Sequence, residues 1–231
     1  RTLGRSMARL HFDAVEHHFG KAPDETVVTF GTGATAVTFR REVISRGFNT
    51  RIADAAVAGG VSQPFYQSGD RSLRGQVRHR IEGVNTSFVP NSACRTAVDA
   101  SVPIESTAAF AACLEMKELG LDCGPSSGLA IYCALVRAQQ RQDAGIGGLI
   151  SVPIYDGSAR YPDTLFNADY LASLEPALTS YRRQIRIFTR SEVWMPLDCC
   201  GQAGKRPDGA GGAPAATHII PTMWPIGECA A

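Results

Sequence analysis

The feature that most constrains the fold is a short hydrophobic strand that leads through a glycine-rich turn directly into a helix. Residues 26–30 (TVVTF) are β-branched or aromatic, which is typical of a buried strand. Residues 31–35 (GTGAT), which we call the glycine loop, form the turn, and residues 34–45 carry apolar side chains at roughly helical spacing before Gly47. A chain that alternates strand and helix in this way favours a parallel sheet covered by helices.

The rest of the chain continues this alternation. The expected elements are helices at residues 10–19, 107–119 and 127–141 and strands at residues 52–57 and 148–154. For the helix at 107–119, Ser106 is expected as the N-cap and Gly120 as the C′ residue. Residues 59–75 are rich in Gly, Ser, Gln and Asp and are predicted to form an irregular loop. The predicted fold class is therefore α/β, with a mostly parallel twisted sheet and helices on both faces.

Charge narrows the classes of partner. The 231 residues include 23 basic and 22 acidic side chains, interspersed along the chain, for a net charge of +1. No basic face suited to nucleic acid or to an anionic membrane surface is expected. The one basic cluster, Arg182, Arg183 and Arg186, is interpreted as a solvated helix face. No run of 18 apolar residues appears, so no membrane span is expected.

Cysteine and histidine usage bears on location and on metals. Seven cysteines, an odd number without close periodic spacing, favour a reduced compartment, so the predicted location is cytoplasmic. The pairs His17-His18 and Cys199-Cys200 are sequence neighbours that do not share a helix face or complete a ligand set. No metal site is predicted.

The character of the sequence changes beyond residue 188. Residues 201–217 are dominated by Gly, Ala and Pro and show no periodic apolar pattern. We expect residues 1–188 to form an α/β domain and residues 189–231 to be a disordered or non-native tail. The sequence begins at Arg1 without an initiator Met, so we expect the domain to be incomplete at its N-terminus.

The glycine loop is the first candidate site. Small residues let backbone N–H groups approach an anion, the helix N-terminus adds positive potential, and two threonine hydroxyls can donate to phosphate oxygens. Two alternatives remain open. Gly31, Gly33 and Ala36 fit a loose dinucleotide fingerprint with Asp54 about 20 residues on. A tight strand-to-helix connection without any ligand would use the same residues.

Three later segments carry further polar groups. They are residues 83–90 (GVNTSFVP), residues 124–128 (GPSSG), which we call the serine turn, and residues 156–161 (DGSARY). A serine in the serine turn can cap the helix that follows or can face a ligand as a neutral hydrogen-bond partner. The segment at 156–161 follows a strand, at the edge where open α/β sheets hold their ligands. Each segment alone indicates only a turn.

The order and spacing of the four segments resemble the cysteine synthase and cystathionine β-synthase family of fold type II pyridoxal-phosphate enzymes. The later half of that family contains a GTGGT phosphate loop, a GIGxGFVP-like segment, a GISSG turn and a DxGERY-like stretch. The resemblance covers about residues 26–167 and implies a tryptophan synthase β-like fold. It implies that the cofactor is pyridoxal 5′-phosphate, with the phosphate held by Gly31, Thr32, Gly33, Ala34 and Thr35, the pyridine nitrogen by Ser126, and the amino-acid substrate beside Gly83 and Asn85.

The departures from the family pattern are as informative as the matches. Asn85 and Ser87 stand where the family has glycines, and Ala34 replaces the third glycine of the loop, a mild change if its φ is helical. Family members also carry, in an earlier domain, the lysine that forms a Schiff base with the cofactor. This chain has only Lys21, Lys117 and Lys205, none in such a setting. We therefore expect no catalytic residue here and an inactive chain on its own.

The function implied by the resemblance is β-replacement or β-elimination on a serine-like amino acid, as in cysteine biosynthesis. The implied partners are that amino acid and either a second copy of the chain, as a homodimer, or a full-length family member. Two other functions remain open: a non-catalytic interaction module or decayed paralogue, and a binder of a phosphosugar or nucleotide that uses the same glycine loop.

Overall fold

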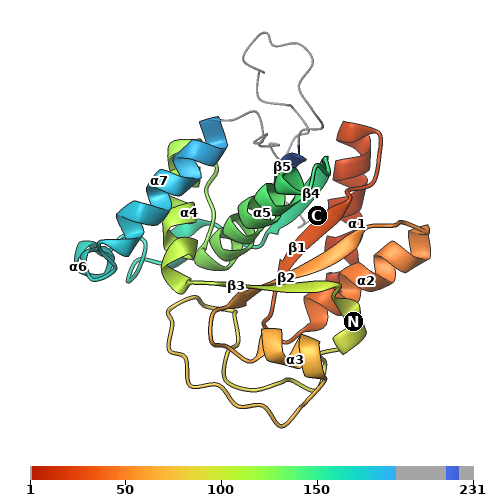
Figure 1. Ribbon diagram of the computed structural model, residues 1–231, viewed down its shortest axis with the longest axis horizontal. Coiled ribbons are helices and arrows are strands. Elements are labelled where there is room, and N and C mark those ends of the chain that lie inside the picture. Colours follow the sequence, from red (N-terminus) through yellow and green to blue (C-terminus); the bar gives the residue numbers. More distant parts are fainter. Residues whose placement is uncertain (1, 191–216, 224–231) are drawn as a thin grey trace, which may run out of the picture.

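A five-stranded parallel sheet forms the centre of the protein. The computed structural model describes residues 2–190 and 217–223. The strand order is β3-β2-β1-β4-β5, and all neighbouring strands are parallel (Figure 1). The strands are β1 (Glu25–Thr29), β2 (Arg51–Val57), β3 (Ala100–Ile104), β4 (Gly148–Ile154) and β5 (Thr217–Met223). The predicted parallel α/β class is confirmed.

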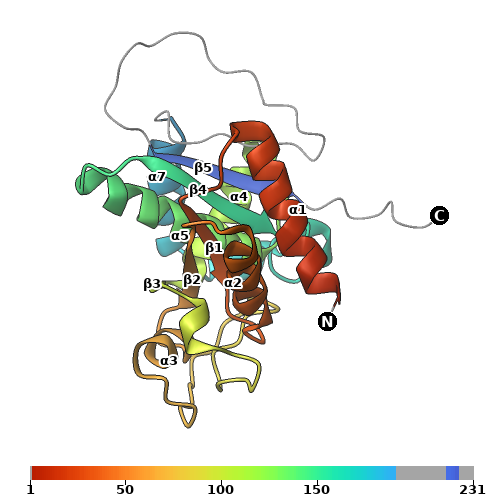
Figure 2. The same cartoon turned by 90° about the vertical axis from the view of Figure 1, so that its right-hand side faces the viewer.

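Helices cover both faces of this sheet, as predicted. They are α1 (Thr2–Phe19), α2 (Ala34–Arg46), α3 (Ser62–Ser68), α4 (Ser106–Glu118), α5 (Pro125–Asp143), α6 (Ala168–Ala172) and α7 (Ala177–Arg190), with 3₁₀ turns at Arg95–Ala97 and Ser158–Arg160. Helices α1 and α2 lie on one face, whereas α5, backed by α4 and α7, lies on the other (Figures 1 and 2). In the described residues, no helix is long and apolar enough to cross a membrane.

The alternation of side chains along the strands divides the core into two layers. Val27 packs in the cluster that contains α4, α5 and α7, whereas its neighbour Val28 packs against α1 and α2. On the α5 side the helices come very close, because a Cβ on Gly128 would collide with the backbone carbonyl oxygen of Ala109 in α4. The glycine therefore sets how closely α5 approaches α4, and with it where the start of α5 lies.

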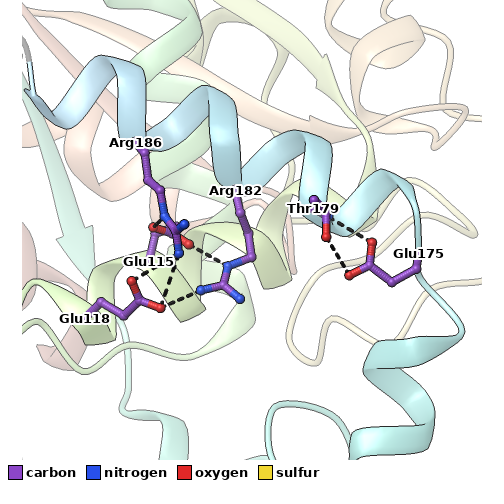
Figure 3. Close-up of polar contacts among 6 residues, drawn as sticks. All are labelled: Glu115, Glu118, Glu175, Thr179, Arg182 and Arg186. Atoms are coloured by element: carbon purple, nitrogen blue, oxygen red, sulfur yellow. Dashed lines mark hydrogen bonds and ion pairs between the residues drawn. The ribbon is translucent and has the colours of Figure 1, made fainter.

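An ion-pair cluster joins α7 to α4 (Figure 3). The side chain of Glu115 is 4% exposed and accepts from Arg182 Nε at 2.5 Å and from Arg186 Nε at 2.6 Å. Glu118, which is more exposed, contacts the same two arginines. The interpretation of the basic cluster as a solvated face was wrong for Arg182, which lies half-buried against α4. It fits Arg183 and Arg186, which are exposed, although Arg186 also contacts Glu115 and Glu118.

The structure also contains elements that the sequence does not predict. Helix α3 lies within the expected loop at 59–75, and β3 includes Pro103, which weakens its strand pattern. Ser106 is the first residue of α4 and not its N-cap, which is Glu105. Most of the expected tail, residues 191–216 and 224–231, lies outside the described residues, but residues 217–223 form β5, which pairs with β4 over seven residues.

Candidate functional site

The candidate site lies where the strand order reverses. From β1 the chain moves to β2 and β3 on one side, whereas β4 pairs with β1 on the other. In open parallel sheets, ligands bind outside the carboxyl ends of the strands at this switch point. The glycine loop follows β1, Asp156 follows β4, and α5 begins at the same edge, because its serine turn hydrogen-bonds Asp156. The fold thus brings the predicted segments to one edge of the sheet.

The glycine loop is held tightly in place. Gly33 has a φ of +77°, and a Cβ there would lie 2.7 Å from Ala93 Cα. A Cβ on Gly31 would collide with the backbone carbonyl oxygen of Gly83. Ser92 Oγ donates to the carbonyl oxygen of Thr32 at 2.5 Å. Larger residues at the two glycine positions would displace the loop, so the glycines are required by close packing and, at Gly33, by the backbone conformation.

The loop presents hydrogen-bond donors at the start of α2. The helix begins at Ala34, and its first-turn N–H groups, including those of Thr35 and Ala36, have no carbonyl one turn earlier to bond. Thr32 is exposed and Thr35 is half-buried. Among described residues only glycines have positive φ, so Ala34 replaces the family's glycine without backbone strain. Donors and helix potential together suit an anion such as phosphate.

The two serines of the serine turn have different surroundings. Ser127 is fully buried, and its Oγ accepts the backbone N–H of Tyr155 at 2.9 Å. Ser126 is 7% exposed, and its hydroxyl makes no hydrogen bond to the described residues. The N-cap of α5 is Gly124, without a side-chain cap, so Ser126 does not act as the cap. Ser127 thus anchors the turn, and the hydroxyl of Ser126 remains available to a ligand.

Tyr155 connects the serine turn to the strand that leads into the glycine loop. Its phenol oxygen accepts the backbone N–H of Thr29, the last residue of β1, at 3.2 Å. Its own backbone N–H donates to Ser127 Oγ. Burial raises the pKa of Tyr155 to about 12, so the phenol stays neutral at physiological pH. Tyr155 was not among the predicted site residues, although it directly precedes the segment at 156–161.

Asp156 lies beside the serine turn and is hydrogen-bonded to it. Its backbone carbonyl accepts the N–H of Gly124 at 2.9 Å, and its Oδ2 accepts the hydroxyl of Tyr161. Its Oδ1 is buried and has no hydrogen-bond partner among the described residues. An unsatisfied buried carboxylate oxygen is costly, and such atoms gather at functional sites. The signal in the sequence was the position of Asp156 directly after a predicted strand.

The segment at 83–90 packs onto the glycine loop, but the side chain of Asn85 is engaged in hydrogen bonds within this segment. The backbone N–H of Asn85 donates to the carbonyl of Phe30 at 2.7 Å. Its side-chain amide donates to the carbonyl of Phe88 at 2.7 Å and accepts the N–H of Ser87 at 3.0 Å. Gly83 lies directly against Gly31. The structure therefore places both residues beside the glycine loop, but the Asn85 side chain holds its own loop together.

Asp54 does not lie where a dinucleotide site requires it. It is 1% exposed, sits within β2 opposite Val28, and its Oδ2 accepts Ser101 Oγ at 2.7 Å. Burial raises its pKa to about 7. A ribose must reach such a carboxylate beyond the end of the strand. The assignment of Asp54 to a ribose is therefore wrong.

The described lysines lie at the surface. Lys21 is exposed and forms an ion pair with Asp24 at 3.6 Å. Lys117 is exposed on α4, with Nζ 4.4 Å from the centre of the Phe166 ring. Lys205 lies outside the described residues. Neither described lysine is buried, as a nucleophilic amine would need to be. The residues that the structure describes also contain no group of three or more metal-ligating side chains.

Fold and site together define a parallel α/β protein whose glycine loop, at the topological switch point, is suited to an anion. No family model matches the sequence. Two curated proteins are similar to it in sequence. The chain is 28% identical over 158 residues to L-cysteine desulfhydrase Cds1 from Mycobacterium tuberculosis, covering 67% of this chain and 43% of the relative. It is 30% identical over 151 residues to cystathionine β-synthase from Dictyostelium discoideum, covering 64% of this chain and 28% of the relative.

Solved structures agree in fold. A hydrogen sulfide-producing enzyme from Fusobacterium nucleatum superposes with a TM-score of 0.58 at 20% identity, over 74% of this chain and 51% of the other. O-ureido-L-serine synthase superposes with a TM-score of 0.55 at 22% identity, over 71% of this chain and 51% of the other. In sequence and in fold, the chain resembles members of the cysteine synthase and cystathionine β-synthase family of fold type II pyridoxal-phosphate enzymes. It spans less than half the length of the two relatives matched by sequence.

Proposed function

We propose that this chain binds pyridoxal 5′-phosphate between the glycine loop and the serine turn. The observation that carries the proposal is the link through Tyr155, which bonds both the end of β1 and the serine turn. It ties the glycine loop to the first turn of α5, where the hydroxyl of Ser126 is unengaged. A ligand with a phosphate at one end and a hydrogen-bond acceptor at the other matches both groups.

The residues of the site fit this cofactor. The phosphate would be held by the first-turn N–H groups of α2 and by the hydroxyls of Thr32 and Thr35, with the α2 N-terminus offsetting its charge. Ser126 would hydrogen-bond the pyridine nitrogen. When bound, the cofactor supplies an electron sink for carbanion chemistry at the α-carbon of an amino acid. A neutral hydroxyl does not enforce the fully protonated ring that a carboxylate favours, which suits reaction at the β-carbon.

The proposed reaction of the whole protein is β-replacement or β-elimination on a serine-like amino acid. The matched relatives support it, since their names describe cysteine desulfhydration, cystathionine synthesis and hydrogen sulfide production. The exposed setting of Lys21 and Lys117 supports the proposal that the chain alone lacks the Schiff-base lysine. The complete site would then need a further segment, from a longer form of this protein or from a full-length family member. That residues 1–188 form one domain remains a prediction, as does assembly of the protein as a homodimer.

Titration of the purified chain with pyridoxal phosphate, monitored by calorimetry, tests the cofactor site. Ser126→Ala should weaken binding of the cofactor about tenfold, the loss expected for one neutral hydrogen bond, and leave binding of inorganic phosphate unchanged. Thr35→Val should weaken the binding of both the cofactor and inorganic phosphate. Ser45→Ala, at the far end of α2, serves as the matched control.

Two outcomes would count against the proposal. If a phosphosugar binds as tightly as the cofactor and Ser126→Ala changes nothing, the loop is a general phosphate site. If borohydride reduction and mass spectrometry find the cofactor attached to Lys21, Lys117 or Lys205, the statement that the chain lacks a competent lysine is wrong.

A further inference from the structure

A cavity lies next to the candidate site. It has a volume of about 220 Å³ and is bounded by Arg80 and Glu82 on one side and by Arg160, Tyr161 and Asp163 on the other. Glu82 directly precedes Gly83, which packs against the glycine loop, and Tyr161 donates its hydroxyl to Asp156. The cavity therefore shares a wall with the proposed cofactor site but contains none of the residues assigned to the cofactor.

Arg80 is positioned by an aromatic ring and not by a carboxylate. Its guanidinium carbon lies 4.9 Å from the centre of the Tyr170 ring. Stacking of this kind uses the flat face of the guanidinium and leaves the N–H donors at its edge for a ligand. Arg80 has no ion-pair partner among the described residues. A stacked arginine with an unengaged edge is suited to bidentate recognition of a carboxylate.

The cavity also presents unpaired negative charge. Glu82 is exposed and has no ion-pair partner in the described part of the chain, although it lines the same cavity as Arg80. The nearest carboxylate to Arg160 belongs to Asp156, at 4.0 Å, which is a loose contact for a largely exposed side chain. Charges of both signs thus line one small space without neutralising each other. A ligand that carries both signs would satisfy them together.

We propose that this cavity binds the head group of a free α-amino acid, with its carboxylate at Arg80 and its ammonium group at Glu82. A cavity of about 220 Å³ holds about seven water volumes of ~30 Å³, and so a ligand of about seven non-hydrogen atoms, the size of serine or cysteine. A phosphate ester would be repelled by Glu82 and Asp163, and a simple carboxylate would leave Glu82 unpaired. The site is additional to the cofactor site and does not depend on its assignment.

Calorimetric titration of the full chain with L-serine tests the proposal. A dissociation constant on the order of 1 mM is expected for so small a ligand. Propionate lacks the ammonium group and ethanolamine lacks the carboxylate, so each should bind at least about tenfold more weakly. Arg80→Met and Glu82→Gln should each weaken L-serine binding to a similar degree. Arg78→Met, an exposed arginine on the same segment that does not line the cavity, should change nothing.

The outcomes that overturn the proposal are distinct from failure of the cofactor site. L-serine binding that survives Arg80→Met and Glu82→Gln, propionate binding equal to that of L-serine, or no binding at all would each refute it. If L-serine binding instead depends on Ser126, the amino acid occupies the cofactor site and the cavity assignment is wrong. Because Arg80→Met also removes the contact with Tyr170, Arg80→Lys, which keeps the charge, should retain part of the affinity, and circular dichroism should show every variant folded.

Discussion

Replacing Asp54 with Asn should make the protein more stable above neutral pH. Asp54 is 1% exposed, and burial raises its pKa from 3.8 to about 7, against smaller effects of hydrogen bonds from Ser101 and Ser62. Between about pH 4 and pH 7, the folded protein holds a proton that the unfolded chain has released. The stability that this proton contributes is complete below pH 3.8. It falls by about 1.4 kcal/mol for each pH unit between pH 3.8 and about 7, and it is lost once the pH has risen through 7.

The magnitude follows from the size of the pKa shift. A rise from 3.8 to about 7 corresponds to a loss of about 4 kcal/mol once the carboxyl is fully ionised. Asn resembles the protonated acid in shape and charge and can still accept from Ser101. The variant should therefore match the wild type near pH 4 and exceed its free energy of unfolding by up to about 4 kcal/mol at pH 8.

His11 should produce the opposite slope, and this sharpens the experiment. The ring bonds Ser151 Oγ at 2.8 Å, and burial lowers its pKa from 6.5 to about 3. Its contribution is therefore present above pH 6.5 and is lost as the pH falls toward 3. In the wild type the two slopes nearly cancel between pH 4 and 6.5. In Asp54→Asn the stability should rise with pH over this range, whereas in His11→Gln it should fall.

Urea unfolding followed by far-UV circular dichroism from pH 4 to pH 8 measures these slopes. Asp163→Asn, an exposed aspartate far along the chain, is the control and should follow the wild type. The reasoning is refuted if Asp54→Asn is less stable than the wild type at pH 8, or if both have the same dependence on pH.

Three further changes test the polar and close-packed contacts of the core by urea unfolding. Glu115→Ala should cost about 1–3 kcal/mol, because it removes the buried acceptor of two charged hydrogen bonds between α4 and α7, whereas Glu118→Ala, at 55% side-chain exposure, should cost under about 1 kcal/mol (Figure 3). Arg137→Met should cost about 3–5 kcal/mol, because it leaves the fully buried Glu25, now bonded at 2.6 and 3.0 Å, without its bidentate partner; a loss below about 1 kcal/mol would contradict this. Gly128→Ala should cost at least about 1–3 kcal/mol, because the new methyl group meets the backbone of α4, and an unchanged midpoint would show that α5 can shift freely.

The parts of the fold that the sequence predicted depend on local patterns. The strand before the glycine loop, the loop and α2 are contiguous in sequence, so periodicity and the glycines at 31, 33 and 47 were enough to define them. Helix α3 is only seven residues long and lies in a polar segment where no apolar period can be read. Strand β5 was missed because its short apolar run is interrupted by Pro221.

The missed parts of the site depend on contacts between distant segments. Tyr155 acts through Thr29, which lies 126 positions away, and Glu115 meets Arg182 across 67 positions. No local pattern encodes such a pairing. For Asn85, the resemblance to the family predicted the position of the residue but not its contacts. Its place beside the glycine loop followed from the family pattern, whereas the hydrogen bonds of its amide to Phe88 and Ser87 are visible only in three dimensions.

The position of β5 bears on how the protein can be shortened. This strand is supplied by residues 217–223, well beyond α7, and it pairs along the whole of β4, from Gly148 to Ile154. A chain cut at residue 190 would leave the N–H and C=O groups of an apolar strand open to pairing with other molecules. Such a truncated protein should aggregate where one ending after Met223 does not. The apparent boundary at residue 188 is therefore an unsuitable place to end an expression clone.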